Sequence, residues 1–122
     1  MRSFEELQNN VIDWANEKGL IHSSEQQARA QLEKMKEEFA EFQEAFEEYF
    51  AADYKFNHTT PAYAIAKANA LESLDLELGD VMVTAIITSA CLSTDPKYAL
   101  EQAWEKIKNR KGKVVNGQFV KD

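Results

Sequence analysis

The chain has 122 residues, 44% of them hydrophobic, and a formal net charge of −7. This size and composition suit one globular domain with a hydrophobic core, so we expect a single domain over residues 1–122. The acidic balance excludes a general nucleic-acid-binding surface, because such a surface needs clustered Lys and Arg to neutralise phosphates.

The expected location of the protein follows from features that the sequence lacks. Its N-terminus has neither the basic start nor the apolar centre of a signal peptide, and no stretch approaches the roughly twenty uninterrupted apolar residues of a membrane span. The only cysteine, Cys91, permits no disulfide within the chain. We therefore expect a cytoplasmic protein with no membrane or nucleic-acid partner.

Two helices are predicted in the first half of the chain. Ser3 and Glu6 have the spacing of a capping box, and apolar residues then recur at helical spacing until Gly19. A second start signal at Ser23 or Ser24 opens a longer helix. Its apolar stripe comprises Leu32, Met35, Phe39, Phe42, Phe46 and Tyr49.

A long connection over residues 53–61 is predicted to lead into a third helix, with Thr60 as cap and Pro61 as first helical residue. After Asp80 this helix is apolar nearly all round as far as Leu92. A helix that is apolar on every side must be covered on every side, and few other helices are available in this chain. A second subunit is the natural source of cover, so we expect a homodimer or homotetramer.

The C-terminal part is predicted to form a fourth helix, starting at Asp95-Pro96 and ending near Arg110. Beyond it, an Asn-Gly pair lies between β-forming residues, which is typical of a hairpin turn. We therefore predict a hairpin tail over residues 113–122. The fold class expected is all-α, a bundle of four to five helices with a short C-terminal β-hairpin.

An acidic pattern occurs twice in the sequence. Residues 35–42 and 74–81 align without a gap on the pattern apolar-x-x-Glu-apolar-small-acid-apolar. Residues three apart are neighbours on a helix, so if the two apolar stripes pack together both acidic pairs converge beside the seam. Like charges repel there unless a cation lies among them, and Mg²⁺ prefers oxygen ligands. The four acids are Glu38, Glu41, Glu77 and Asp80.

A solvated helix face is the alternative interpretation of these acids, since Glu-x-x-Glu is common in acidic helices. The repetition favours a metal site. Both copies also have a small residue between the acids, Ala40 or Gly79, which we interpret as room for close helix approach. Gly inside a helix otherwise costs about 1 kcal/mol relative to Ala.

Basic and aromatic residues near the predicted site have two interpretations each. Lys34 is placed to pair with Glu38 one turn away or to bind a phosphate. The cations that end the fourth helix also complement its dipole. Trp14 and Trp104 have helical spacing with other apolar residues, which favours core packing over stacking on a nucleobase.

These motifs resemble the MazG family of all-α nucleoside triphosphate pyrophosphohydrolases, particularly its short phage- and prophage-type members. The resemblance rests on Glu38-x-x-Glu41 and Glu77-x-x-Asp80, with Gln31-x-x-Lys34 ahead of the first pair. The resemblance extends from the first predicted helix to the C-terminal tail. Further matching segments are Trp14 to Gly19, Ile107 to Lys113 and Asn116 to Lys121.

The resemblance implies hydrolysis of a nucleoside triphosphate to the monophosphate and pyrophosphate, with Mg²⁺ as cofactor and Mn²⁺ as the alternative. It implies a bundle of the all-α NTP pyrophosphatase type that is completed by oligomerisation. Glu38, Glu41, Glu77 and Asp80 would bind metal, with Glu38 as the catalytic carboxylate that orients or deprotonates the attacking water. Substrate phosphates would be held by Lys34, Lys106 and Arg110.

The chain departs from the family pattern in two places. The connection between its acidic pairs is longer, with the extra length around residues 53–68, and Trp104 stands where many relatives have an Asn. Two other functions stay open at this point: phosphoribosyl-ATP pyrophosphohydrolase activity in the same superfamily, and a non-enzymatic helical interaction module whose acids are only solvated.

Overall fold

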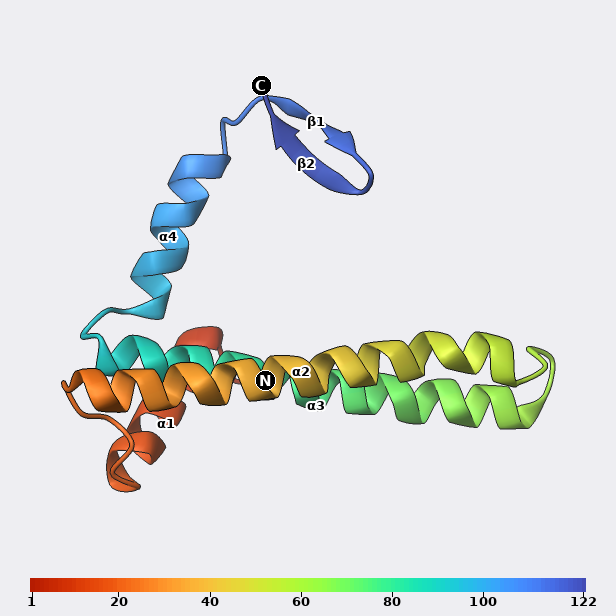
Figure 1. Ribbon diagram of the computed structural model, residues 1–122, viewed down its shortest axis with the longest axis horizontal. Coiled ribbons are helices and arrows are strands. Elements are labelled where there is room, and N and C mark those ends of the chain that lie inside the picture. The colour runs from red at the N-terminus through yellow and green to blue at the C-terminus, as the bar shows by residue number, and fades with distance from the viewer.

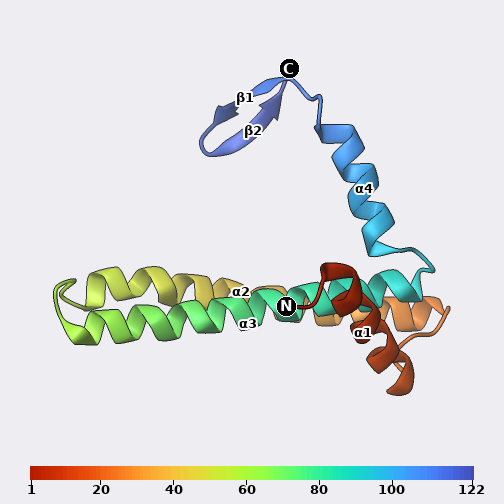
Figure 2. The same cartoon turned by 180° about the vertical axis from the view of Figure 1, so that it is seen from behind.

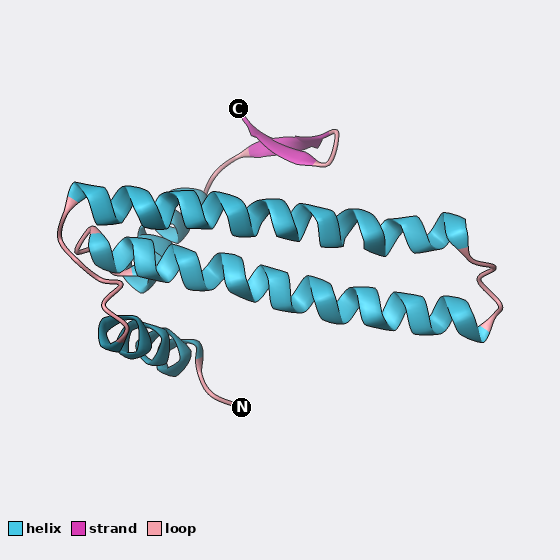
Figure 3. Ribbon diagram, turned by 60° about the horizontal axis from the view of Figure 1, so that its bottom comes forward, coloured by secondary structure: helices cyan, strands magenta, loops and turns pink.

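A computed structural model describes all 122 residues as four helices and a two-stranded antiparallel sheet (Figure 1). This confirms a mostly helical chain with a short C-terminal hairpin. Helices α2 and α3 lie side by side along their lengths, and α1 crosses them at one end (Figures 1 and 3). The elements are α1 (Phe4–Glu17), α2 (Glu25–Lys55), α3 (Pro61–Cys91), α4 (Pro96–Ile107), β1 (Gly112–Val115) and β2 (Gln118–Lys121).

Side-chain caps fix where each helix begins. The Glu6 amide donates to the Ser3 hydroxyl at 3.1 Å, as the capping-box spacing predicted. Of the two serines predicted to open the second helix, Ser24 is the cap. Each cap satisfies one of the amides that the first helical turn leaves unpaired. The four N-caps are Ser3, Ser24, Thr60 and Asp95.

The connection between α2 and α3 is shorter than the sequence predicted. Helix α2 continues to Lys55, so only residues 56–60 form the loop and most of the segment 53–68 is helical. Asp53 explains the extra turn, because its carboxylate accepts from the Tyr63 hydroxyl at 2.7 Å and pairs with the Lys67 ammonium at 3.0 Å. His58 joins this network of polar contacts, because its Nε2–H donates to the Asp53 carbonyl at 2.8 Å.

The fully buried residues of α2 recur at every seventh position, on the face of the helix that meets α3. Gln31, Glu38, Ala45 and Ala52 are buried along this seam. A seven-residue repeat keeps one face of a helix against a neighbour, as in coiled coils, and the two alanines allow close approach.

The apolar stripe predicted for α2 is split by this seam. Half of it lies half-buried beside α3, and the other half is 40–50% exposed because the chain provides no third long helix to cover it. The half-buried residues are Met35, Phe42 and Tyr49, and the exposed ones are Leu32, Phe39 and Phe46.

The hydrophobic core is small and lies where α1 crosses α3. Ala15, Ile87 and Cys91 form its buried centre. Only 11 of the 122 residues are buried, and within the apolar end of α3 Met82 and Leu92 remain exposed. A chain with 44% hydrophobic residues therefore leaves much of its apolar surface uncovered. No single helix is both long enough and apolar enough to cross a membrane.

Helix α4 and the β-hairpin stand away from the rest of the molecule (Figures 1 and 2). Helix α4 ends at Ile107, three residues earlier than predicted, and strand β1 begins one residue before the predicted tail. Asn116 and Gly117 both have positive φ, which is the backbone of the Asn-Gly turn that the sequence indicated. None of the residues in these three elements is buried.

The network of polar contacts around Asp53 at the α2–α3 loop gives a prediction about stability. The Tyr63 hydroxyl and Lys67 hold the pKa of Asp53 below its ordinary value of 3.8. A lowered carboxyl pKa contributes stability above that ordinary value, and the contribution is lost as pH falls through the folded-state pKa. We expect Asp53→Asn to lower the Tm by roughly 5 °C at pH 7.

Thermal unfolding monitored by circular dichroism measures this difference across pH. The gap between wild type and Asp53→Asn should close as pH is lowered below 3.8. Glu47→Gln, an exposed acid on the same helix, is the matched control and should leave the Tm unchanged. A constant gap at every pH would contradict a role for the Asp53 charge.

Candidate metal centre

Three of the four predicted acids converge at the middle of the helical hairpin. Each of Glu38, Glu77 and Asp80 offers a carboxylate oxygen, and the three oxygens lie within 4.8 Å of one another. Glu38 points at α3 because it belongs to the seven-residue seam of α2. Glu77 and Asp80 are three residues apart on α3, so both face the same point. The predicted convergence of the two acidic motifs is therefore present within a single chain.

Asp80 is exposed and Glu77 is half-buried, but two buried carboxylate oxygens distinguish this cluster from a solvated acidic face. Glu38 is only 8% exposed, and its Oε2 has no hydrogen-bond partner. Oε2 of Glu77 is likewise buried without a partner. A buried, unpaired carboxylate oxygen is unfavourable unless a cation or a hydrogen-bond donor satisfies it. Two such oxygens from facing helices form a donor set that fits a hard divalent cation.

Glu41 lies beside the cluster and is affected by its charge. The neighbouring Glu38 carboxyl raises the Glu41 pKa above 4.5, first through hydrogen bonding between the two groups and then through Coulombic repulsion, and burial and Glu77 raise it further. Neighbouring negative charges favour the protonated form of a carboxyl. All four predicted metal residues therefore belong to one electrostatic group, and it has an excess of negative charge.

Lys34 is the only base that pairs with this group. Its Nζ lies 3.3 Å from Oε1 of Glu38 and 3.2 Å from Oε1 of Glu37. These hydrogen bonds, from Glu37 first and Glu38 second, raise the Lys34 pKa above 10.5. The ion-pair interpretation of Lys34 is thus confirmed. Its side chain is also 48% exposed, so the ammonium faces solvent beside the acids.

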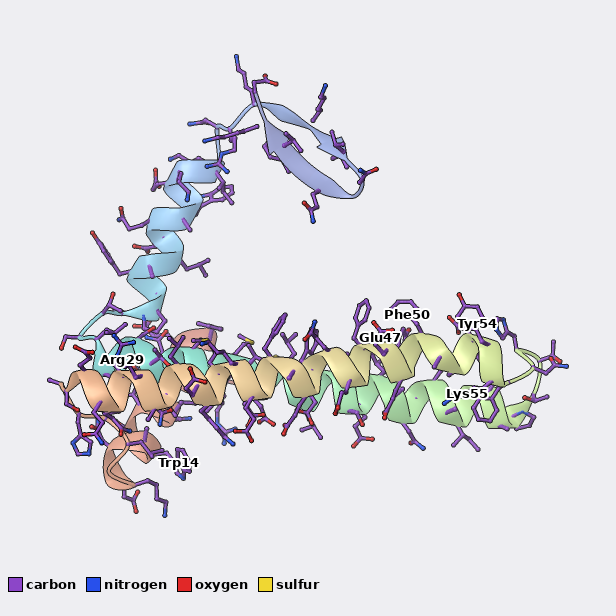
Figure 4. The ribbon with its side chains drawn as sticks, in the orientation of Figure 1. Trp14, Arg29, Glu47, Phe50, Tyr54 and Lys55 are labelled. Carbon is purple, nitrogen blue, oxygen red and sulfur yellow. The ribbon has the colours of Figure 1, made fainter.

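A cleft of about 450 Å³ adjoins the cluster, between α1, α2 and α3. Lys34, Glu38 and Asp80 line one part of it, and Trp14 of α1 lines another. Figure 4 shows Trp14 projecting from α1 beneath the hairpin. Core packing was the wrong prediction for Trp14, which is 49% exposed, because Ala15 and not Trp14 is the α1 residue at the buried centre of the core.

Gln31 is the site-adjacent residue that motif reasoning did not assign to the site. It lines the same cleft, is only 8% exposed, and its amide makes no hydrogen bond within the chain. Its position seven residues before Glu38 was the available signal, because the two share one face of α2. The side-chain amide of a Gln that lines a cleft can donate to and accept from a polar ligand.

Three other residues that the sequence analysis singled out, Lys106, Arg110 and Gly79, do not contribute to the acidic cluster of their own chain. Lys106 lies in the last turn of α4 and Arg110 follows the helix, and α4 leads away from the hairpin that carries the acids (Figure 1). This chain therefore does not bring either base to its own acidic cluster. Gly79 faces open space, since a side chain there would meet nothing within 4 Å, so it is not needed for the approach of α2.

Comparison of the chain with protein-family models, with curated proteins and with solved structures finds no match. The geometry of the site and its sequence motifs are therefore the only indications of its function.

Repulsion within the cluster gives a prediction about metal binding. We expect Mg²⁺ to raise the Tm of the wild type by roughly 3–8 °C, because a cation bound only by the folded state stabilises it. Glu38→Gln should raise the metal-free Tm by relieving repulsion and should remove most of the Mg²⁺ response.

Differential scanning fluorimetry over a Mg²⁺ titration measures both effects. Glu44→Gln, an exposed acid elsewhere on α2, is the control and should keep the full response. Equal Mg²⁺ responses in Glu38→Gln and wild type would show that the cation acts at other surface charges.

Proposed function

We propose that this protein is a MazG-like nucleoside triphosphate pyrophosphohydrolase that needs Mg²⁺, with Mn²⁺ as an alternative, and releases pyrophosphate and the nucleoside monophosphate. The observation that carries the proposal is the convergence of Glu38, Glu77 and Asp80, with two buried carboxylate oxygens that lack a partner. The sequence motifs around these acids support the same assignment.

The four acids would hold the metal ion, with Glu38 and Glu77 as the strongest candidates because their free oxygens are already desolvated. Bound there, Mg²⁺ supplies neutralisation of charge on phosphate oxygens and lowers the pKa of a coordinated water. Glu38 is the acid best placed to orient or deprotonate the attacking water, because Lys34 engages only its Oε1. Glu41 borders the other acids and adds to the negative field.

Substrate would occupy the cleft next to the acids. Lys34 lies at the boundary between the acids and solvent, where its ammonium is positioned to meet a phosphate oxygen. The exposed Trp14 ring offers a flat apolar face, and the Gln31 amide offers a donor and an acceptor. These three side chains give the cleft features suited to a molecule that has both an aromatic base and phosphates.

Oligomerisation is part of the proposal. Leu71, Leu76, Leu78 and Met82 of α3 and the outer half of the α2 stripe are exposed in one chain, which is the surface expected of a subunit in a homodimer or homotetramer. The same surface supports the alternative of a helical interaction module that binds another protein. The two functions differ in whether the acids are required, so a substitution of Glu38 separates them.

Release of pyrophosphate is the direct test of the proposed reaction. The purified protein is incubated with a panel of ribo- and deoxyribonucleoside triphosphates, with and without Mg²⁺. We expect Mg²⁺-dependent release, reduced at least about 100-fold in Glu38→Gln because general acid–base groups contribute on that scale. Glu44→Gln should retain the wild-type rate. Absence of release from every nucleotide would refute this reaction and favour the interaction module.

Trp14 provides a second test, directed at the cleft. We expect Trp14→Ala to raise KM roughly tenfold with little change in kcat, since aromatic stacking on a base contributes about 1–3 kcal/mol. Trp14→Phe keeps a ring and should restore most of the affinity. Steady-state kinetics on the best nucleotide measures both constants. A fall in kcat and Tm at unchanged KM would assign Trp14 to structure alone.

A further inference from the structure

The last fifth of the chain forms an arm that has no core of its own. We define the arm as residues 96–121, which comprise α4 and the β-hairpin. An isolated two-stranded hairpin is marginal in water, and a single amphipathic helix needs a surface for its apolar side. The arm contains no buried residue, although it is rich in large apolar side chains. The exposed ones are Tyr98, Leu100, Trp104, Ile107, Val114, Val115, Phe119 and Val120.

Contacts with α1 fix the direction in which the arm leaves the α2–α3 hairpin of its own chain. Asp95 accepts from Nε2 of Gln8 at 3.0 Å and from the Lys97 amide at 2.9 Å. Gln8 is only 5% exposed, so this bond is shielded from water, and Lys97 pairs with Glu5 at 3.4 Å. Helices α3 and α4 meet at an angle of 101°. The hairpin to which the arm is attached therefore does not cover it.

The arm and the α2–α3 hairpin have complementary charge. Residues 106–113 include five bases and no acid, and only Lys108 among these bases forms an ion pair. Helices α2 and α3 together contain 13 acids and five bases. Opposite potentials on two surfaces steer and orient their association. The acidic surface that best complements the basic arm is thus the α2–α3 hairpin, and every copy of this chain has one.

The apolar surfaces correspond in the same way. Leu32, Phe39 and Phe46 recur at seven-residue intervals on the exposed side of α2. Such spacing presents a continuous seam on which another helix can pack. Helix α4 has exposed Leu100, Trp104 and Ile107 at helical spacing, which form an apolar ridge for such a seam.

We propose that the arm docks on the α2–α3 hairpin of a second copy of this chain, with its basic segment 106–113 beside the acidic cluster of that copy. In a twofold dimer each chain gives one arm and receives one, so both arms are covered. Each site then combines acids from one chain with bases from the other. A phosphate-binding role for Lys106 and Arg110 in the partner's site rests on the proposed function, whereas docking itself does not.

Sedimentation velocity on the full-length protein tests the docking by charge. Two unpaired bases of the arm, Lys106 and Arg110, are changed to Glu together. The matched control changes two bases outside both the arm and the α2–α3 hairpin to Glu, namely Arg2 and Lys18. We expect wild type and control to dimerise and the dissociation constant of the arm variant to rise at least about tenfold, which is 1.4 kcal/mol. A monomeric wild type, or an arm variant that dimerises as the control does, would overturn the proposal.

Cross-linking between differently tagged chains tests where the arm lies. In a Cys91→Ser background, one chain carries Arg110→Cys and the other Glu37→Cys, next to the acidic cluster. A short bismaleimide should join the two chains. Asn57→Cys, in the loop at the far end of the hairpin, replaces Glu37→Cys in the control and should cross-link at least about tenfold less. Equal cross-linking yields for Glu37→Cys and Asn57→Cys would overturn the trans arrangement. A third sample, in which one chain has both Arg110→Cys and Glu37→Cys, would overturn it if cross-links formed only within that chain.

Neither experiment uses a nucleotide, so failure of docking is distinguishable from failure of the proposed hydrolysis.

Discussion

The structure depends on an arrangement in which acidic side chains lie in and beside the seam between two helices. Glu38 occupies a seam position of α2 that would ordinarily be apolar, and Glu77 and Asp80 meet it from α3. Burial of carboxylates is expensive, and Lys34 offsets only part of the charge. The hairpin keeps this unfavourable group because favourable packing holds α2 and α3 together at both ends. The site is therefore held in place by the ends of the hairpin and not by the acids themselves.

The two ends achieve this by different physical means. At the loop, the Asp53 carboxylate joins the end of α2 to Tyr63 and Lys67, whose ammonium also donates to the Tyr49 carbonyl and lies over the Tyr49 ring at 3.4 Å. At the other end, Ala15 of α1 and Ala28 of α2 pack against Ile87 and Cys91 of α3. One end is closed by a polar network and the other by a hydrophobic cluster. Between them the helices run antiparallel and present the acids at a fixed separation.

The lone chain has too little buried surface to account for its composition. A 122-residue protein normally covers its apolar side chains, whereas here the aromatic stripe of α2, much of α3 and the whole arm face solvent. These exposed parts are not scattered singly, since on α2 and α4 they recur at helical spacing. Assembly and the site are consequently linked in our proposals: the same second copy that covers the apolar faces also brings bases to the acids.

Local signals in the sequence determined the helix starts, the Asn-Gly turn and the pairing of the acidic motifs, because caps, turns and residues three apart act over a few positions. The end of α2 was not predictable, because Asp53 is held by Tyr63 and Lys67 from another helix. The exposure of Trp14 and the position of Gln31 in the cleft were not predictable for the same reason, since both depend on how α1 and α3 meet α2. Tertiary structure also decided that Lys106 and Arg110 lie away from the acids of their own chain. Periodicity states which residues share a face of a helix, but only packing decides what that face meets.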